Sequence, residues 1–244
     1  WRIGSIKRDI PIIASAMDGV VDVDMAVNLS KMGALGVLNL EGVQTRYENP
    51  KTVLEQISQV SKDNFVPLMQ EIYSQPIKKE LIRKRIEEIK KKGGIASVSG
   101  TPLATLKFKE IIQDAGADLF FLQATVVSTE HIGPEGSQRL DLKELCKTMR
   151  IPVIVGNCVT YNVAIDLMRA GASAVLVGIG PGAACTSRGV LGVGIPQATA
   201  VTDCAAARDQ YERETGKHIP ILADGGIITG GDICKCIACG ADAV

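Results

Sequence analysis

Residues 178–188 combine the residue types that nucleophilic chemistry by a thiol requires. An apolar run leads into three glycines and a proline, and the loop then presents Cys185 close to Arg188. Glycine allows backbone angles that a side chain would forbid, so such a loop can expose consecutive N–H groups. A neighbouring cation or oriented N–H groups favour the reactive thiolate. We therefore expect Cys185 to be a nucleophile. The alternative is an ordinary strand-to-helix turn that holds a small apolar cysteine.

Three further cysteines, Cys234, Cys236 and Cys239, have a spacing that could indicate a zinc or iron–sulfur site. However, Asp232 stands where a helix N-cap is expected, and a helix would spread the three thiols over different faces. A fourth ligand close in sequence is missing, because Cys204 lies well upstream. These features favour packing cysteines over a metal site.

The composition limits the class of protein. The 244 residues suit one domain, and 27 basic residues balance 27 acidic ones. The balance gives no field that would favour nucleic acid or an anionic membrane as a partner. Apolar runs end well before membrane-spanning length, and no apolar signal stretch opens the chain. We expect a cytoplasmic protein whose seven cysteines are free thiols.

Short apolar runs alternate with segments of helical period. The expected strands are 11–17, 34–40, 95–99, 119–124, 152–158, 174–180 and 220–226. One helix is expected at 22–32, with Met25, Ala26, Leu29 and Met32 facing inward, and another at 160–170. Strands that are apolar throughout, each followed by a helix, indicate a parallel sheet covered by helices.

A repeated joint sharpens the expected fold. Glycine-alanine pairs at Gly33, Gly116, Gly171 and Gly240 each end a helix with a left-handed residue and begin an apolar run. The repeat predicts an α/β fold, a (β/α)8 TIM barrel, with a doubly wound open sheet as the alternative. The fourth joint starts a strand in which the chain stops. We therefore expect one catalytic barrel domain over 1–244, incomplete at both ends and truncated before its last strand, with a basic helical excursion at about 64–92.

The carboxyl ends of the expected strands carry the groups that could form a site, because a (β/α) barrel places its working residues there. Those groups are Ser15, Met17, Asn39, Gln123, Thr125, Asn157, the Cys185 loop and Asp224 with Gly225 and Gly226. One thiol, one carboxylate and several amides and hydroxyls would face a common opening. In the alternative interpretation Asp224 is only a turn residue.

The motifs resemble the inosine monophosphate (IMP) dehydrogenase and guanosine monophosphate (GMP) reductase family. The resemblance rests on residues 11–18, 156–160, 178–188, 192–200 and 223–227, in the same order as in the family. It covers nearly the whole chain and is strongest for a short dehydrogenase-related bacterial branch without the inserted regulatory domains. It implies an enzyme that oxidises IMP to xanthosine monophosphate (XMP) with NAD.

The resemblance also implies a role for each matching residue. Cys185, with the hydroxyl of Ser187 nearby, would attack C2 of the purine and form a covalent thioimidate. The substrate-binding residues would be Ser15, Met17, Asn157, Asp224, Gly225 and Gly226, with the carboxylate of Asp224 on the ribose and the glycines at the phosphate. Gln123, Ala124 and Thr125 would meet the NAD cofactor. The carbonyl groups of Gly180, Gly182 and Cys185 would bind a potassium ion, and the family implies a homotetramer or octamer.

Three positions depart from the family pattern. Leu176 replaces an arginine, Ala183 replaces a serine that would contact the phosphate, and Gln123 replaces an aspartate that holds the nicotinamide ribose. The flap that carries the hydrolytic base lies beyond this sequence. Two alternatives therefore stay open beside the dehydrogenase: a GMP reductase that uses NADPH, and a purine-nucleotide-binding barrel without turnover.

Overall fold

A computed structural model gives the fold, and it describes residues 1–129 and 140–244. The strand order of the main sheet is β3-β4-β5-β6-β7-β8-β9, so each strand is followed along the sheet by the next one in the chain. At least one helix separates every two consecutive strands of this sheet. This order confirms the expected (β/α)8 class. The chain divides into two compact units, residues 14–120 and residues 1–13 with 121–244, with boundaries inside β3 and β6.

The unit of residues 14–120 holds two full strands and six helices among the described elements. They are α1 (Val23–Met32), β4 (Leu35–Asn39), α2 (Val43–Arg46), α3 (Pro50–Gln59), α4 (Phe65–Ser74), α5 (Lys79–Lys91), β5 (Ser97–Gly100) and α6 (Pro102–Asp114), after β3 (Ile13–Ala14). Strands β4 and β5 pair in parallel, with Val37 opposite Ser97. Both strands are almost wholly buried; β4 is mainly apolar, whereas β5 buries the small polar residues Ser97 and Ser99.

Helix α1 forms where the sequence predicts it, but it buries a different face. The Asp22 side chain accepts the Met25 N–H at 2.8 Å and caps the helix. The buried residues include Val23, Ala26 and Val27, whereas Met25 is 43% and Met32 is 67% exposed. The expected inward face was therefore wrong for both methionines, whereas Ala26 and Leu29 do lie close to Gly36 of β4.

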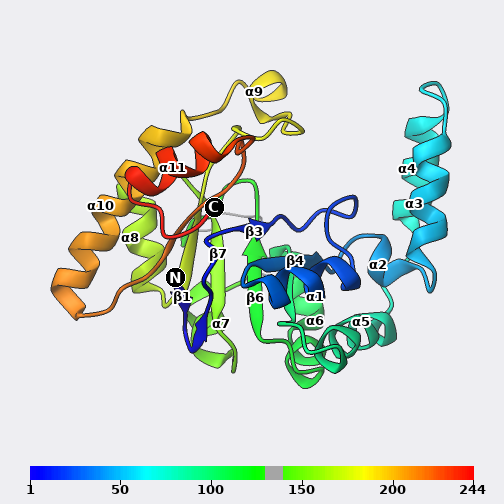
Figure 1. The fold of residues 1–244 in the computed structure, drawn as a ribbon, viewed down its shortest axis with the longest axis horizontal. Helices are drawn as coiled ribbons and strands as arrows, with labels where there is room; N and C mark the ends of the chain where they lie inside the picture. The colour runs from blue at the N-terminus through cyan, green and yellow to red at the C-terminus, as the bar shows by residue number, and fades with distance from the viewer. Residues whose placement is uncertain (130–139) are drawn as a thin grey trace, which may run out of the picture. The chain divides into compact units, whose positions relative to one another are not determined.

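Helices α3 and α4 form a hairpin, side by side in Figure 1. The apolar run after Asn64 is the first half of α4, and the basic segment is α5. The hairpin has its own small core of Val43, Val53 and Ile72. Lys92, at the end of α5, contacts Asp24 at 2.6 Å, so this basic end is paired in part.

The second unit carries the remaining elements. They are β1 (Arg2–Ile3), β2 (Ile6–Lys7), β6 (Leu119–Gln123), α7 (Leu142–Thr148), β7 (Val153–Cys158), α8 (Tyr161–Arg169), β8 (Ala174–Val177), α9 (Ser187–Val190), α10 (Gln197–Thr215), β9 (Ile221–Ala223) and α11 (Gly230–Ala238). Strands β7, β8 and β9 pair in parallel, with Val155 opposite Val175 and Val175 opposite Ile221. Helices α8 and α10 pack on one another beside these strands (Figure 1).

All four glycine-alanine joints have the predicted geometry. The φ angles of Gly33, Gly116, Gly171 and Gly240 lie between 85° and 105°, in the region that favours glycine. The last joint leads to Ala243, which bridges Leu222 in parallel and accepts the Ala223 N–H at 2.9 Å. Val244 exchanges backbone hydrogen bonds with residues 11 and 13. Residues 243–244 thus occupy the strand position between β9 and β3. No helix in the described ranges has the length and apolar character needed to cross a membrane.

Candidate active site

The predicted nucleophile lies in the loop that follows β8. Cys185 is exposed, and its N–H donates to the Gly182 carbonyl at 3.1 Å, which closes a tight turn. Its Sγ lies 3.3 Å from Oγ of Ser187, the first residue of α9. Ser187 is itself buried, so its hydroxyl is held in place while the thiol faces solvent. The loop therefore presents a thiol with a fixed hydroxyl partner.

The surroundings of Cys185 favour its thiolate. Hydrogen bonds from the side chain and backbone of Ser187 lower the pKa of the Cys185 thiol, and the charge of Arg188 adds to this. By contrast, burial raises the pKa of Cys146 to about 11, and burial also raises the pKa of Cys236. Cys185 therefore combines exposure with a lowered pKa, which is what a reactive cysteine needs.

Other cysteines pack in the interior. Cys158 and Cys204 are both buried, with their Sγ atoms 4.0 Å apart, and Cys236 is buried on α11. All seven cysteines are free thiols, and no group of His, Cys, Asp and Glu within 1–129 and 140–244 could hold a metal. The cap of α11 differs from expectation: the N-cap is Thr229, and Asp232 sits at the third helical position and completes a capping box.

The loop that follows β9 and the thiol loop are both rich in glycine and lie in close contact. Gly225 and Gly226 follow β9 with φ angles of 88° and 74°. A Cβ on Gly226 would lie 2.8 Å from the Pro181 carbonyl oxygen, and one on Gly225 would lie 3.3 Å from the Gly182 nitrogen. The backbones of the two loops are therefore in close contact. Only residues without side chains allow this approach, which brings the loop of Cys185 next to Asp224.

Asn157 at the end of β7 joins the two loops. Its Nδ2 donates to the Gly178 carbonyl at 3.0 Å and to Oδ2 of Asp224 at 2.8 Å. Burial raises the pKa of Asp224, and the hydrogen bond from Asn157 opposes that rise. Asn157 and Asp224, both predicted to bind substrate, are thus brought together with the thiol loop by β7, β8 and β9.

The sequence analysis assigned no role to Gln197, although this residue stands in one of the matching motifs. It is the first residue of α10, and its Nε2 donates to the carbonyls of Val177 at 2.7 Å and Asp224 at 3.3 Å. These carbonyls end β8 and follow β9. The sequence signal was a glutamine directly after a proline at a helix start, but its partners are visible only in the fold.

The predicted cofactor residues lie at the end of β6. Ala124 exchanges backbone hydrogen bonds with Gly156 and Asn157, at 2.9 and 3.0 Å, so its backbone joins β6 to β7. The side chain of Gln123 is half-buried and Thr125 is exposed. An amide and a hydroxyl at a strand end can hydrogen-bond a sugar, so these two side chains fit a ribose. Ala124 has no polar side chain, and its backbone hydrogen bonds with Gly156 and Asn157 fix the end of β6 beside β7.

The predicted potassium ligands are backbone groups of the thiol loop. Gly180 has a φ of 84°, and the Gly182 carbonyl accepts the Cys185 N–H. A carbonyl oxygen has two lone pairs, so this bond leaves one for a cation. A ring of carbonyl oxygens suits a potassium ion, and these groups fit one to that extent.

Ser15 and Met17 belong to the unit of residues 14–120. Both are exposed, Met17 at 47%, and the Met17 N–H donates to the Ser15 carbonyl at 2.8 Å. All three departures from the family pattern lie in the other unit, where Gln123 has been described above. Leu176 is buried in β8, where its Cβ would be 2.3 Å from a Cβ on Gly156, and Ala183 is exposed in the thiol loop. Leu176 therefore packs against the neighbouring strand and has no free position toward a phosphate.

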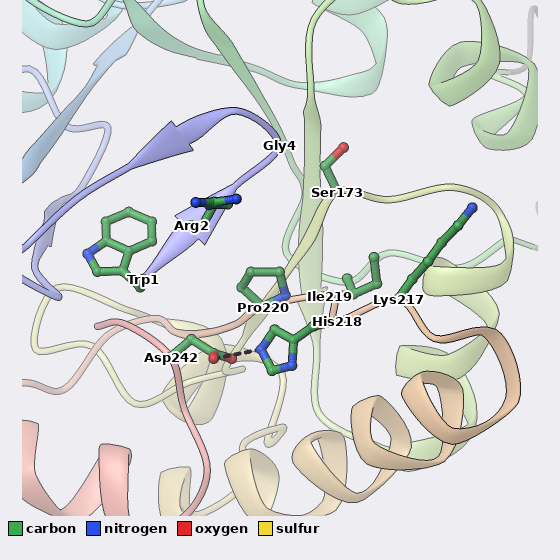
Figure 2. Close-up of a pocket in the computed structure, with 9 residues that line it drawn as sticks. All are labelled: Trp1, Arg2, Gly4, Ser173, Lys217, His218, Ile219, Pro220 and Asp242. Atoms are coloured by element: carbon green, nitrogen blue, oxygen red, sulfur yellow. Dashed lines mark hydrogen bonds and ion pairs between the residues drawn. The ribbon is translucent and has the colours of Figure 1, made fainter.

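A cavity of about 500 Å³ lies at the opposite end of β9 from Asp224. Figure 2 shows its lining residues, among them Trp1, Lys217, His218 and Asp242. Nδ1 of His218 lies 2.7 Å from Glu212, and Nε2 lies 2.8 Å from Asp242. Burial lowers the pKa of His218, but the two carboxylates outweigh it and the pKa is raised. This cavity shares no lining residue with the loops around Cys185.

Comparison with known proteins shows which proteins this chain is similar to. The family model described as "IMP dehydrogenase / GMP reductase domain" matches residues 3–244. An uncharacterized oxidoreductase of Mycolicibacterium smegmatis is 35% identical over 100% of this chain and 67% of its own length. The IMP dehydrogenase of Cryptosporidium parvum is 32% identical over 98% of this chain and 59% of its own. The crystal structure of an IMP dehydrogenase/GMP reductase-like protein from Corynebacterium glutamicum superposes with a TM-score of 0.91 at 34% identity, over 100% of this chain and 65% of that one.

Proposed function

Because the chain belongs to the IMP dehydrogenase/GMP reductase family, we propose that its protein oxidises IMP to XMP with NAD, with Cys185 as the nucleophile. The observation that carries the proposal is the exposed thiol of Cys185, 3.3 Å from the Ser187 hydroxyl and with a lowered pKa. The chain spans 59–67% of the length of the relatives described above, so the proposal concerns the complete protein.

The thiol makes the oxidation a two-stage reaction. The Cys185 thiolate adds to C2 of the purine, the C2–H bond breaks, and a covalent thioimidate remains. Bound NAD supplies the acceptor for the hydride and its electron pair. Water then adds to C2, the carbon–sulfur bond breaks, and the thiolate leaves as XMP forms, with one proton of the water kept by the product and the other released to solvent. The Ser187 hydroxyl stabilises the thiolate before the first stage and after the second.

The Asp224 loop suits the sugar and phosphate of the nucleotide. A carboxylate accepts hydrogen bonds from two ribose hydroxyls, and Asn157 orients it for that purpose. Gly225 and Gly226 have left-handed φ angles, and successive N–H groups in such a turn can donate hydrogen bonds to a phosphate. The family resemblance also implies Ser15 and Met17 as substrate-binding residues.

The proposal extends to the cofactor, the ion and the assembly. Gln123 and Thr125 would bind the nicotinamide ribose of NAD, while Gly180, Gly182 and Cys185 would hold potassium. The protein would act in the cytoplasm as a homotetramer or octamer. Exchange of potassium for lithium should then lower the rate of the complete enzyme, since lithium is too small for a ring built for potassium.

The test is the Cys185→Ala variant of the complete protein, with Cys234→Ala as the matched control because Cys234 is also exposed. We expect Cys185→Ala to lose at least about a thousandfold in kcat, because no covalent intermediate can form. IMP binding measured by calorimetry should change little. NADH formation within a few-fold of the wild-type rate would contradict the role of Cys185. NADPH consumption with GMP, in place of NADH formation with IMP, would identify the reductase.

A further inference from the structure

We infer that Gln197 is a positioning residue that fixes the Asp224 carboxylate relative to Val177, where the Cys185 loop leaves β8. The inference rests on the proposed function for its nucleotide-binding readout. It concerns a residue that makes no contact with the Cys185 thiol in the described structure and acts through the backbone of two loops.

The contacts of Gln197 join two strand ends. Its Nε2 lies 2.7 Å from the carbonyl of Val177, the last residue of β8, and 3.3 Å from the carbonyl of Asp224, the residue after β9. Asp224 N–H donates to the same Val177 carbonyl at 2.8 Å. One side-chain amide on α10 therefore holds the backbone of both loops where they leave the sheet.

Asn157 and Gln197 hold Asp224 from two sides. Asn157, on β7, binds the carboxylate, while Gln197, on α10, binds the main-chain carbonyl of the same residue. Gly178 lies between them: a Cβ there would be 2.3 Å from the Asp224 carbonyl oxygen and 2.9 Å from Gln197 Oε1. With its backbone and its carboxylate both fixed, Asp224 has little freedom to turn relative to the thiol loop.

The acceptor atom of Gln197, its Oε1, indicates that this residue serves the site rather than the stability of the fold. Oε1 is buried, and the described residues give it no hydrogen-bond partner. A buried acceptor without a partner costs free energy. Rotating the amide would not help, because it would place Oε1 against the two carbonyl oxygens. The amide is thus fixed as a donor to two loops at a cost to stability, which is typical of residues kept for a site.

The test compares Gln197→Met with Gln210→Met in the complete protein. Both changes replace an amide with an apolar side chain on α10, but Gln210 contacts Glu214 and Arg213, away from the loops. We expect Gln197→Met to weaken IMP binding about tenfold by calorimetry, the effect of about one lost hydrogen bond on a positioned carboxylate. Gln210→Met should match wild type. Alkylation of Cys185 by iodoacetamide, followed by mass spectrometry, should change in rate for Gln197→Met alone.

A double-variant comparison separates positioning from general weakening. If Gln197 acts through Asp224, Gln197→Met should have a smaller effect on IMP affinity in an Asp224→Asn background than in wild type. Equal effects in both backgrounds, with unchanged Cys185 alkylation, would overturn the inference. Should wild type fail to bind IMP, the proposed function fails, and the alkylation rates of Gln197→Met and Gln210→Met still decide the role of Gln197.

A second variant covers the case in which Gln197→Met does not fold. Gln197→Glu keeps the shape of the side chain but can donate only when its carboxyl is protonated. Its alkylation rate at Cys185, normalised to wild type at each pH, should approach the wild-type rate as the pH falls. A normalised rate that does not depend on pH would contradict the inference.

Discussion

The hydrogen bonds of Asn157 make the stability of the protein depend on pH in a way that Asn157→Leu should reveal. Leucine has the same branched shape as asparagine, with larger methyl groups in place of the amide atoms, but cannot donate to the Gly178 carbonyl or to the Asp224 carboxylate. The bond to the neutral carbonyl is worth about 1 kcal/mol, and the bond to the charged carboxylate about 1.5–3 kcal/mol. At neutral pH the variant should therefore lose about 2.5–4 kcal/mol in free energy of unfolding.

The size of the loss should depend on the charge of Asp224. Burial raises the pKa of Asp224 above the unfolded value, which is about 3.9, so its ionisation destabilises the folded state as the pH rises through the folded pKa. The bond from Asn157 opposes this, and its removal raises the pKa further. As the pH falls and the Asp224 carboxyl becomes protonated, the loss should decrease toward about 2 kcal/mol, the value of two neutral hydrogen bonds.

Urea denaturation followed by circular dichroism from pH 4 to pH 8 measures the difference. The control is Asn162→Leu, which makes the same change at an exposed position of α8 in the same unit and should cost less than about 0.5 kcal/mol at every pH. A difference between Asn157→Leu and wild type that stays constant with pH would refute the coupling to Asp224. A loss below that of the control would refute both hydrogen bonds.

Two further predictions concern the cavity that His218 lines and the contact between the Gly226 loop and the Cys185 loop. His218→Gln removes an imidazolium held by two carboxylates, one of them Asp242. Because the folded pKa of His218 is raised, the variant should be less stable than wild type below about pH 6.5, and the difference should vanish as the pH rises through the folded pKa. Thermal unfolding from pH 5 to pH 9 measures this difference. Equal melting differences at all pH values would contradict this. Gly226→Ala should destabilise by about 1–2 kcal/mol or more, since its φ is 74° and the new Cβ would meet the Pro181 oxygen, while Gly230→Ala, with open space, should not. Equal unfolding midpoints in urea for the two variants would argue against the loop contact.

The repeated glycine-alanine joint made the fold predictable because glycine is the residue that best adopts the positive φ needed at the end of a helix. A glycine that ends a helix with positive φ can be read directly, as at Gly33 and Gly171. The inward face of α1 could not be read, because its apolar residues cover two overlapping stripes and contact with β4 decides between them. The N-cap at Thr229 was accessible from its spacing to Asp232, since that spacing is the capping-box signature.

The surroundings of the candidate nucleophile could be predicted where they lie close to it in the sequence. Cys185 stands out because glycines, a hydroxyl and a cation surround it within a few residues. Asn157 and Asp224 could be assigned to strand ends, but their mutual hydrogen bond depends on the order and register of β7, β8 and β9. Gln197 was missed for the same reason, because its partners are backbone carbonyls that no side-chain pattern marks.

The pairing of residues 11–13 with Val244 has a consequence for biosynthesis. The unit of residues 14–120 is continuous in the chain, whereas the other unit joins residues 1–13 to 121–244. During synthesis residues 1–13 leave the ribosome long before residues 121–244 exist. We expect the continuous unit to acquire structure first, while the opening segment waits uncovered until the last joint is made. A chaperone that recognises short apolar stretches would find its target there, around Ile10, Ile12 and Ile13, and nascent-chain crosslinking would detect it.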